Sequence, residues 1–159
     1  MDKKLLGSLL FSLLLLFTGC STTYYEAKPK DTYTPTKINV TEKYSKNDVA
    51  LIKVADGISI WEVDGERKVN AFKMILGLSG LDSILIPEGD HRFACRKKYR
   101  SGYNIRINNT FFKGGHEYLV DYLQVDDKKI YYWVEDLTDG KIVYGKKVTA
   151  ESLSKEVDI

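Results

Sequence analysis

Short runs of β-branched and aromatic residues alternate with turn residues along most of the chain from Val49 onward. This pattern predicts strands over Val49–Val54, Ile58–Val63, Ser83–Ile86, His91–Tyr99, Tyr103–Phe112, Glu117–Val125, Ile130–Asp136 and Lys141–Lys147. Four pairs of residues supply the positive φ angles that tight hairpins need: Asp56-Gly57, Asp64-Gly65, Gly114-Gly115 and Asp139-Gly140. Many short strands at regular spacing predict an all-β fold, an antiparallel β-sandwich of about seven strands.

Two segments depart from the strand pattern. Apolar residues between Val69 and Leu81 recur at helical spacing, but Gly77 and Gly80 oppose a long helix, so the sequence leaves the conformation of residues 66–82 open. At the other end, Thr149 is placed to cap a helix, and Val148 can pack against Leu153 across its first turn. We therefore predict a short C-terminal helix.

The first twenty residues have the pattern of an export signal. Lys3 and Lys4 precede an apolar run, Leu5–Phe17, of about 13 residues, whereas a membrane-spanning helix needs about 20. The run ends in Thr18-Gly19-Cys20, which resembles the lipobox of bacterial lipoproteins. The resemblance implies that residues 1–19 are a signal peptide, that Cys20 carries the lipid, and that Ser21 directs the protein to the outer membrane. The alternative is an ordinary secreted protein.

The segment that follows is rich in Ser, Thr, Lys and Tyr and contains Pro29 and Pro35, without an aliphatic run that could build a core. We predict a lipidated flexible tether over residues 20–47 and a folded domain over residues 48–159.

Composition agrees with a single globular domain. The chain has 159 residues, 43% of them hydrophobic, and a net charge of +2, so it carries no strong positive field for nucleic-acid binding. Cys20 and Cys95 are the two cysteines. With Cys20 lipidated, no intramolecular disulfide is expected. Strand alternation points Cys95 into the core with Phe93 and Tyr99.

Catalytic chemistry is poorly represented in the sequence. It contains two histidines, His91 and His116, and none of the common hydrolase or phosphate-binding motifs. The hairpin order places both histidines at one end of the domain, where Asp90 and Glu117 could join them in a weak metal site. Cys95 would lie about 13 Å along the strand, too far to complete it. We expect no catalytic residues, no cofactor and no metal.

A basic surface is the main candidate binding site. Alternation turns four basic side chains outward, and they form a candidate anion-binding patch: Arg92, Arg96, Lys98 and Arg106. A three-residue loop, Arg100–Gly102, would place Arg96 directly opposite Arg106, which is unfavourable unless compensated. The compensating group would be either Asp121, which a Gly114-Gly115 hairpin places opposite Asn108, or an anionic partner. Lipopolysaccharide phosphate and peptidoglycan carboxylate are partners of that kind.

The aromatic run Tyr131-Tyr132-Trp133 allows a second binding mode. Aromatic ring faces stack on sugars, so the run could form a glycan platform, but packing in the core explains at least one of its faces equally well.

Several turn motifs carry a family resemblance: Asp64-Gly65, Pro87-Glu88-Gly89-Asp90-His91, Ser101-Gly102-Tyr103 and Gly115-His116-Glu117-Tyr118. From about Val49 to Asp136 the chain resembles the PEGA-type and related transthyretin-like sandwiches of bacterial envelope proteins. The resemblance implies a β-sandwich without catalytic residues. We therefore expect a non-enzymatic envelope lipoprotein, held to the membrane by the lipid on Cys20. It would present a binding or scaffolding module to anionic glycan or to another envelope protein. A small hydrolase with a cryptic site is the alternative from another class.

Overall fold

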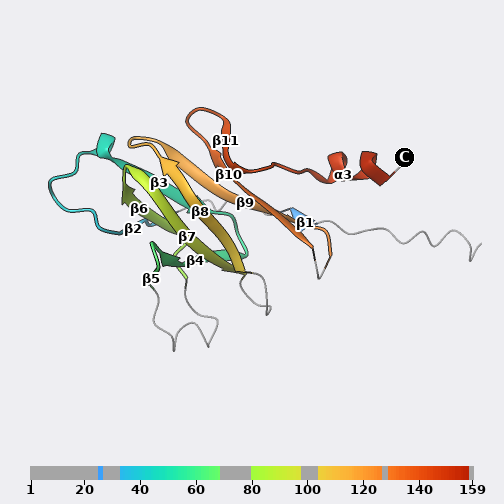
Figure 1. Ribbon diagram of the computed structural model, residues 1–159, viewed down its shortest axis with the longest axis horizontal. Coiled ribbons are helices and arrows are strands. Elements are labelled where there is room, and N and C mark those ends of the chain that lie inside the picture. Colours follow the sequence, from blue (N-terminus) through green and yellow to red (C-terminus); the bar gives the residue numbers. More distant parts are fainter. Residues whose placement is uncertain (1–24, 27–32, 69–79, 98–103, 127–128, 158–159) are drawn as a thin grey trace, which may run out of the picture.

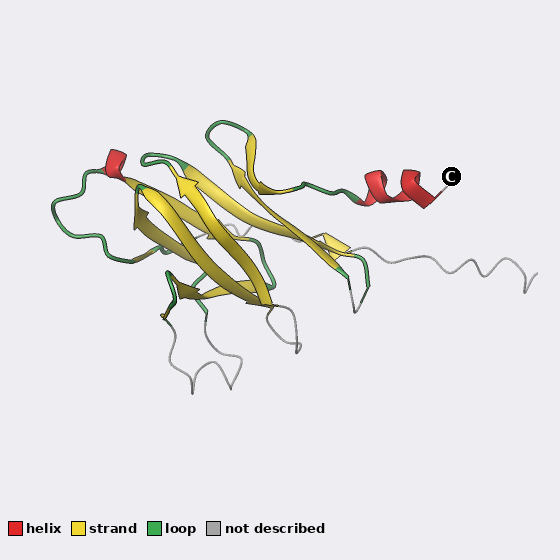
Figure 2. Ribbon diagram, in the orientation of Figure 1, coloured by secondary structure: helices red, strands yellow, loops and turns green. Residues whose placement is uncertain are grey.

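Two β-sheets form the protein, as the computed structural model shows for residues 25–26, 33–68, 80–97, 104–126 and 129–157 (Figures 1 and 2). The larger sheet has the order β11-β10-β9-β3-β6-β2, with β1 also pairing with β9, and the smaller has the order β5-β4-β7-β8. This arrangement confirms the predicted all-β sandwich.

The longer strands coincide closely with the predicted runs. The larger sheet contains β1 (Tyr25–Glu26), β2 (Thr36–Lys37), β3 (Val49–Val54), β6 (Ser83–Pro87), β9 (Glu117–Gln124), β10 (Ile130–Asp136) and β11 (Lys141–Gly145). The smaller sheet contains β4 (Ile58–Val63), β5 (Glu66–Arg67), β7 (Gly89–Lys97) and β8 (Asn104–Phe112). A 3-10 turn, η2 (Lys46–Asp48), precedes β3, and the helix α3 (Ala150–Val157) follows β11.

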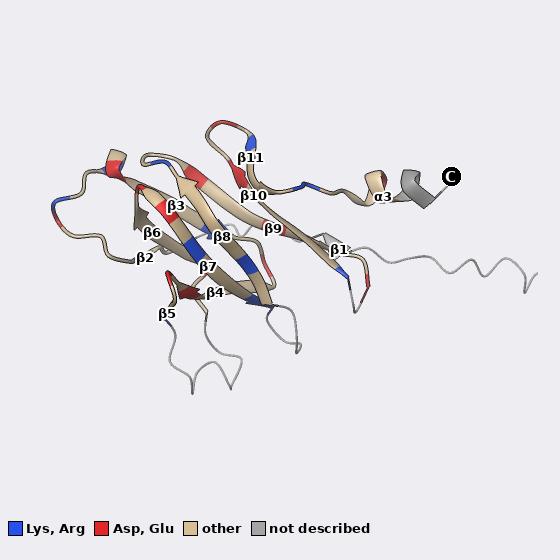
Figure 3. Cartoon of the chain, in the orientation of Figure 1, with Lys and Arg blue, Asp and Glu red and all other residues tan. Residues whose placement is uncertain are grey.

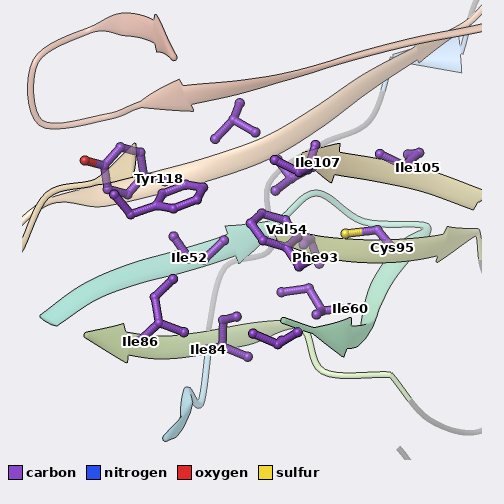
Figure 4. Packing of buried hydrophobic residues seen from close by; sticks show 14 of the residues in the cluster. Ile52, Val54, Ile60, Ile84, Ile86, Phe93, Cys95, Ile105, Ile107 and Tyr118 are labelled. Atoms are coloured by element: carbon purple, nitrogen blue, oxygen red, sulfur yellow. The ribbon is translucent and has the colours of Figure 1, made fainter. Parts of the chain in front are cut away.

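The core lies between the sheets, where alternate residues of each strand meet (Figure 4). On β7, Phe93 and Cys95 point inward and are 2% and 0% exposed, which confirms their predicted orientation. Phe112 and Tyr118 close one end of this core, with their rings in an edge-to-face contact at 5.0 Å. Burial of these apolar side chains is the main force that holds the sheets together.

The chain switches sheets between β8 and β9, so the predicted Gly114-Gly115 hairpin is wrong. Strand β9 lies in the larger sheet, parallel to β3 and antiparallel to β10. At the crossing, the backbone of Asn47 passes so close that a Cβ on Gly114 would lie 2.1 Å from the Asn47 carbonyl oxygen. Gly114 is therefore required for close backbone approach.

Part of the predicted tether belongs to the folded domain. Strand β2 pairs in parallel with β6, the backbone N–H of Ile38 donates to the carbonyl of Leu85, and the Ile38 side chain is only 7% exposed. The hydroxyl of Tyr33 donates to the carbonyl of Val54. A single isoleucine at the sheet edge gives no hydrophobic run, which is why composition alone placed the boundary at residue 48.

The C-terminal helix begins as predicted. The hydroxyl of Thr149 accepts a hydrogen bond from the backbone N–H of Ser152. Val148 and Leu153 contribute to a second apolar cluster, which also contains Leu123 and Trp133 and lies apart from the main core. The helix therefore starts next to an apolar patch of the larger sheet.

Several sequence predictions lie outside the described residues. These are the signal peptide 1–19, the lipidation site Cys20, most of the segment 66–82, the side chains of Lys98 and Tyr99, and the Arg100–Gly102 loop. Within the described part of the chain, no helix is both long and apolar enough to cross a membrane.

Candidate functional site

Three arginines lie on the outer side of the smaller sheet, and we call Arg92, Arg96 and Arg106 the arginine face. Figure 3 shows basic positions, in blue, along both β7 and β8. On β7 the inward positions are taken by Phe93 and Cys95, so Arg92 and Arg96 project to the other side, as predicted. The same alternation on β8 buries its Ile105 and Ile107 and leaves Arg106 exposed. The face is thus a direct consequence of strand alternation.

The register differs from the prediction by two residues. Arg96 pairs with Asn104, and Arg106 pairs with Ala94, so the two arginines are diagonal rather than directly opposite. The predicted Arg100–Gly102 loop between these strands lies outside the described residues. Diagonal placement relieves part of the repulsion that the sequence analysis expected.

The three arginines surround one small residue, Ala94. Arg92 and Arg96 are its neighbours two positions away on the same face of β7, at a Cα separation of roughly 7 Å. Arg106 lies directly across from it on β8, at roughly 5 Å. Ala94 has no side chain beyond Cβ to hold the arginines apart. Their long side chains can therefore converge on one bound group.

The counter-charges on this face are few. Within the described parts of the chain, none of the three guanidinium groups is in an ion pair. Two acids lie on this face: Glu62 of β4, across from Ala94 on the side away from Arg106, and Asp90 of β7, two positions before Arg92. Arg92 extends over the β4–β5 turn, where a Cβ on Gly65 would lie 2.9 Å from a guanidinium nitrogen.

Asp121 does not provide the expected compensation. It lies on β9 in the other sheet, across from Trp133 of β10, and β9 does not pair with β8. The error follows from the sheet switch at residues 113–116, because the predicted hairpin would have aligned β9 with β8. On β8, the carbonyl of Arg106 instead accepts a hydrogen bond from the hydroxyl of Tyr144.

His91 is held by two acceptors at one end of the sandwich. Its Nδ1 lies 2.8 Å from a carboxylate oxygen of Asp64, and its Nε2 lies 2.9 Å from the carbonyl oxygen of Pro87. Asp64 has a positive φ of 52° in the β4–β5 turn, and its other oxygen accepts the backbone N–H of Arg92. Both ring nitrogens are thus engaged, so His91 offers no free base for catalysis.

His116 pairs with Asp136 at the start of β9. Its Nδ1 lies 2.8 Å from Asp136 Oδ2, and its ring stacks on Tyr118 at 6.3 Å between centroids. Asp136 Oδ1 accepts the backbone N–H groups of Thr138 and Asp139. Burial alone would raise the pKa of the Asp136 carboxyl, but the hydrogen bonds from His116 and from the two backbone N–H groups outweigh it and hold that pKa below its ordinary value.

Both histidines contact the aromatic pair at one end of the core. His91 lies 6.5 Å from Phe112 between ring centroids, and Phe112 contacts Tyr118, on which His116 stacks. The expected partners were wrong, however, because the carboxylates that bind the rings are Asp64 and Asp136 rather than Asp90 and Glu117. Asp64 and Asp136 both lie at turns. Which histidine lies beside which turn depends on which strands are neighbours, and the sequence does not reveal this.

The remaining candidates are buried. Burial raises the pKa of the Cys95 thiol far above its ordinary value, so this cysteine is a small apolar core residue. Trp133 is only 4% exposed and lies in the second apolar cluster, while Tyr132 packs against the main core. The aromatic run therefore does not form the exposed row of rings that a glycan platform needs.

Comparison with known proteins does not add a relative: no family model, curated protein or solved structure matches the chain. The lipobox and PEGA-type resemblances therefore stay predictions, and a function can be inferred only from the geometry of the chain's own residues.

Proposed function

We propose that this protein is a non-enzymatic lipoprotein of the bacterial envelope, whose β-sandwich binds anionic envelope material through the arginine face. The observation that carries the proposal is the placement of Arg92, Arg96 and Arg106 at strand positions around Ala94, without ion pairs among the described residues. Arginine is suited to this role because its planar guanidinium binds phosphate or carboxylate oxygens in pairs.

A lipid anchor would support the proposal, because it would hold the domain near such material. Lipidation at Cys20, with Ser21 after it, would hold the protein at the outer membrane. Lipopolysaccharide phosphates and peptidoglycan carboxylates would both be within reach of a module on a short linker. The face carries the three arginines against two acids, Glu62 and Asp90, and the remaining positive charge favours an anionic ligand.

A salt-dependent retention assay tests the binding. Arg96→Gln/Arg106→Gln should be retained on anionic envelope material about tenfold less than wild type at low salt, because each exposed contact contributes roughly 0.5 to 1 kcal/mol. The difference in retention should shrink at high salt, because salt screens the charges and weakens the retention of the wild-type protein as well. Lys37→Gln/Lys43→Gln is the matched control, since it removes two exposed charges elsewhere. Equal retention of the arginine variant and wild type at low salt contradicts the proposal.

Two retention matrices separate the ligand classes. Loss of binding to lipopolysaccharide vesicles, with peptidoglycan retention unchanged, identifies the phosphate ligand, and the reverse pattern identifies the carboxylate ligand. Binding to another envelope protein is the remaining alternative, and photo-crosslinking from Asn104 or Asn108 on the same face would capture it.

The hydrolase alternative is tested separately. Among the described residues, no Ser, Thr or Cys side chain is hydrogen-bonded to either histidine, so the geometry favours binding over nucleophilic catalysis. Turnover of generic esters or glycosides that disappears in both His91→Ala and His116→Ala would overturn the non-enzymatic proposal.

A further inference from the structure

The geometry points to a binding site for one first-row transition-metal ion of the Zn²⁺ type, formed by His116, Asp136 and Asp139. The three residues come from two connections at one end of the larger sheet. His116 precedes β9, Asp136 ends β10, and Asp139 lies in the β10–β11 turn. Asp136 pairs with Tyr118, so the antiparallel register brings His116 next to this turn.

The ligand atoms are already close to the separations that a metal requires. One ligand atom from each residue lies within 4.8 Å of the other two, and His116 Nδ1 is 2.8 Å from Asp136 Oδ2. With metal–ligand bonds of about 2.0 to 2.2 Å, tetrahedral coordination separates its ligands by about 3.3 Å. The largest separation must shrink by at most about 1.5 Å, and the half-exposed side chain of Asp139 can make this shift through a rotamer change.

The two buried ligands are held in place before metal binds. The ring of His116 is only 11% exposed and is oriented by its stack on Tyr118. The backbone N–H groups of Thr138 and Asp139 bind Oδ1 of Asp136, which leaves Oδ2 directed at the imidazole. The turn is fixed further by a hydrogen bond from the backbone N–H of Glu117 to the Thr138 hydroxyl. Such preorganisation lowers the entropic cost of binding.

Metal binding replaces the hydrogen that now lies between His116 Nδ1 and Asp136 Oδ2. The imidazole stays neutral if its hydrogen moves to Nε2, which makes no hydrogen bond to the described residues. Two carboxylates then neutralise the divalent charge. Among the described residues, Lys141 is the cation in an ion pair with this cluster: its ammonium lies 4.0 Å from Asp139 Oδ2, on a largely exposed side chain that can turn away.

The ligand set selects the class of metal. One imidazole nitrogen and two carboxylate oxygens suit Zn²⁺, Co²⁺ or Ni²⁺, with water in the open position. Ca²⁺ takes six to eight oxygen ligands, and Mg²⁺ prefers oxygen ligands in an octahedral arrangement. We therefore expect both to bind weakly. No metal was expected from the sequence, because histidines beside turns are more often solvated and Cys95 lies too far along its strand. The strand pattern also gave no sign that the β10–β11 turn lies beside His116.

The test uses the lipidated full chain in detergent micelles, without an affinity tag. Titration with Co²⁺ should give a visible absorption band that saturates at one ion per chain, and Zn²⁺ should displace it. Asp139→Asn should weaken Co²⁺ binding at least tenfold, since loss even of an outer-shell group costs 10- to 100-fold. This substitution is at an exposed turn, so the variant should have the same melting temperature as the wild-type protein. Asp90→Asn, an exposed acid on β7, is the control and should bind as wild type does.

The same titration defines the results that would overturn the site. No saturable Co²⁺ band in the wild-type chain overturns it, as does an Asp139→Asn affinity within tenfold of wild type. Displacement of Co²⁺ by Ca²⁺ at the concentration that suffices for Zn²⁺ overturns the assigned metal class. His116→Gln is a second test, provided that this variant melts at the wild-type temperature. Because it removes the imidazole nitrogen, it should abolish the part of the Co²⁺ band intensity that depends on that ligand.

Discussion

The packing of residues 33–47 against the larger sheet can be tested with one side chain, Ile38. Its side chain is 7% exposed and joins the main core beside β6, while its backbone N–H donates to Leu85. Truncating a buried isoleucine to alanine costs about 2 to 5 kcal/mol. Ile38 lies at the sheet edge, where neighbours can close over a cavity, so we expect Ile38→Ala to lower the free energy of unfolding by about 2 kcal/mol.

Urea denaturation followed by tryptophan fluorescence measures this loss, with the chain from residue 21 onward. The midpoint should fall without a change in slope, and the melting temperature should drop by about 6 to 10 °C, given about 3 to 5 °C per kcal/mol for a domain of this size. Thr36→Ala, at an exposed position of β2, is the control and should stay within about 0.5 kcal/mol of wild type. An Ile38→Ala variant as stable as this control would refute the packing and restore a tether up to residue 47.

Three further outcomes are expected. Cys20→Ala should abolish metabolic palmitate labelling and release an unprocessed or soluble form, as fractionation and immunoblotting would show; continued labelling would exclude Cys20 as the lipid site. Gly114→Ala should destabilise the domain by about 2 kcal/mol or more, because its Cβ would lie 2.1 Å from the Asn47 carbonyl oxygen; an unchanged urea midpoint would contradict that contact. Burial raises the pKa of the Cys95 thiol, so at pH 8 it should react with a thiol reagent only as the domain unfolds, whereas fast labelling of folded protein would show that it is accessible.

Local features of the fold were predictable from the sequence. The ends of β3, β4 and β10 match the predicted ranges residue for residue, because alternation and Asp-Gly turns act over a few neighbours. Gly57, Gly65 and Gly140 have φ values of 84°, 85° and 68°, as the turn chemistry required. The outward orientation of the arginine face follows from the same alternation.

Long-range pairing was not predictable in the same way. Whether β9 adjoins β8 or β3 depends on contacts between residues more than 60 positions apart, for which the sequence carries no local signal. The same limit explains the register of β7 and β8, since a shift of two residues keeps every side chain on its face. It also explains the histidine partners Asp64 and Asp136, each of which lies 20 or more residues from its ring.

Both candidate sites depend on the crossing between β8 and β9. If these strands formed the predicted hairpin, Asp121 would lie near Arg106 and neutralise part of the arginine face. The crossing instead moves β9 into the larger sheet, where Asp121 faces Trp133, and leaves β8 as the last strand of the smaller sheet. The same step places His116 just before β9, two positions beyond the Tyr118 and Asp136 pair, and so brings it to the β10–β11 turn. The crossing, where Gly114 lies against the Asn47 backbone, thus underlies both the arginine face, which has no ion pairs among the described residues, and the histidine–carboxylate cluster.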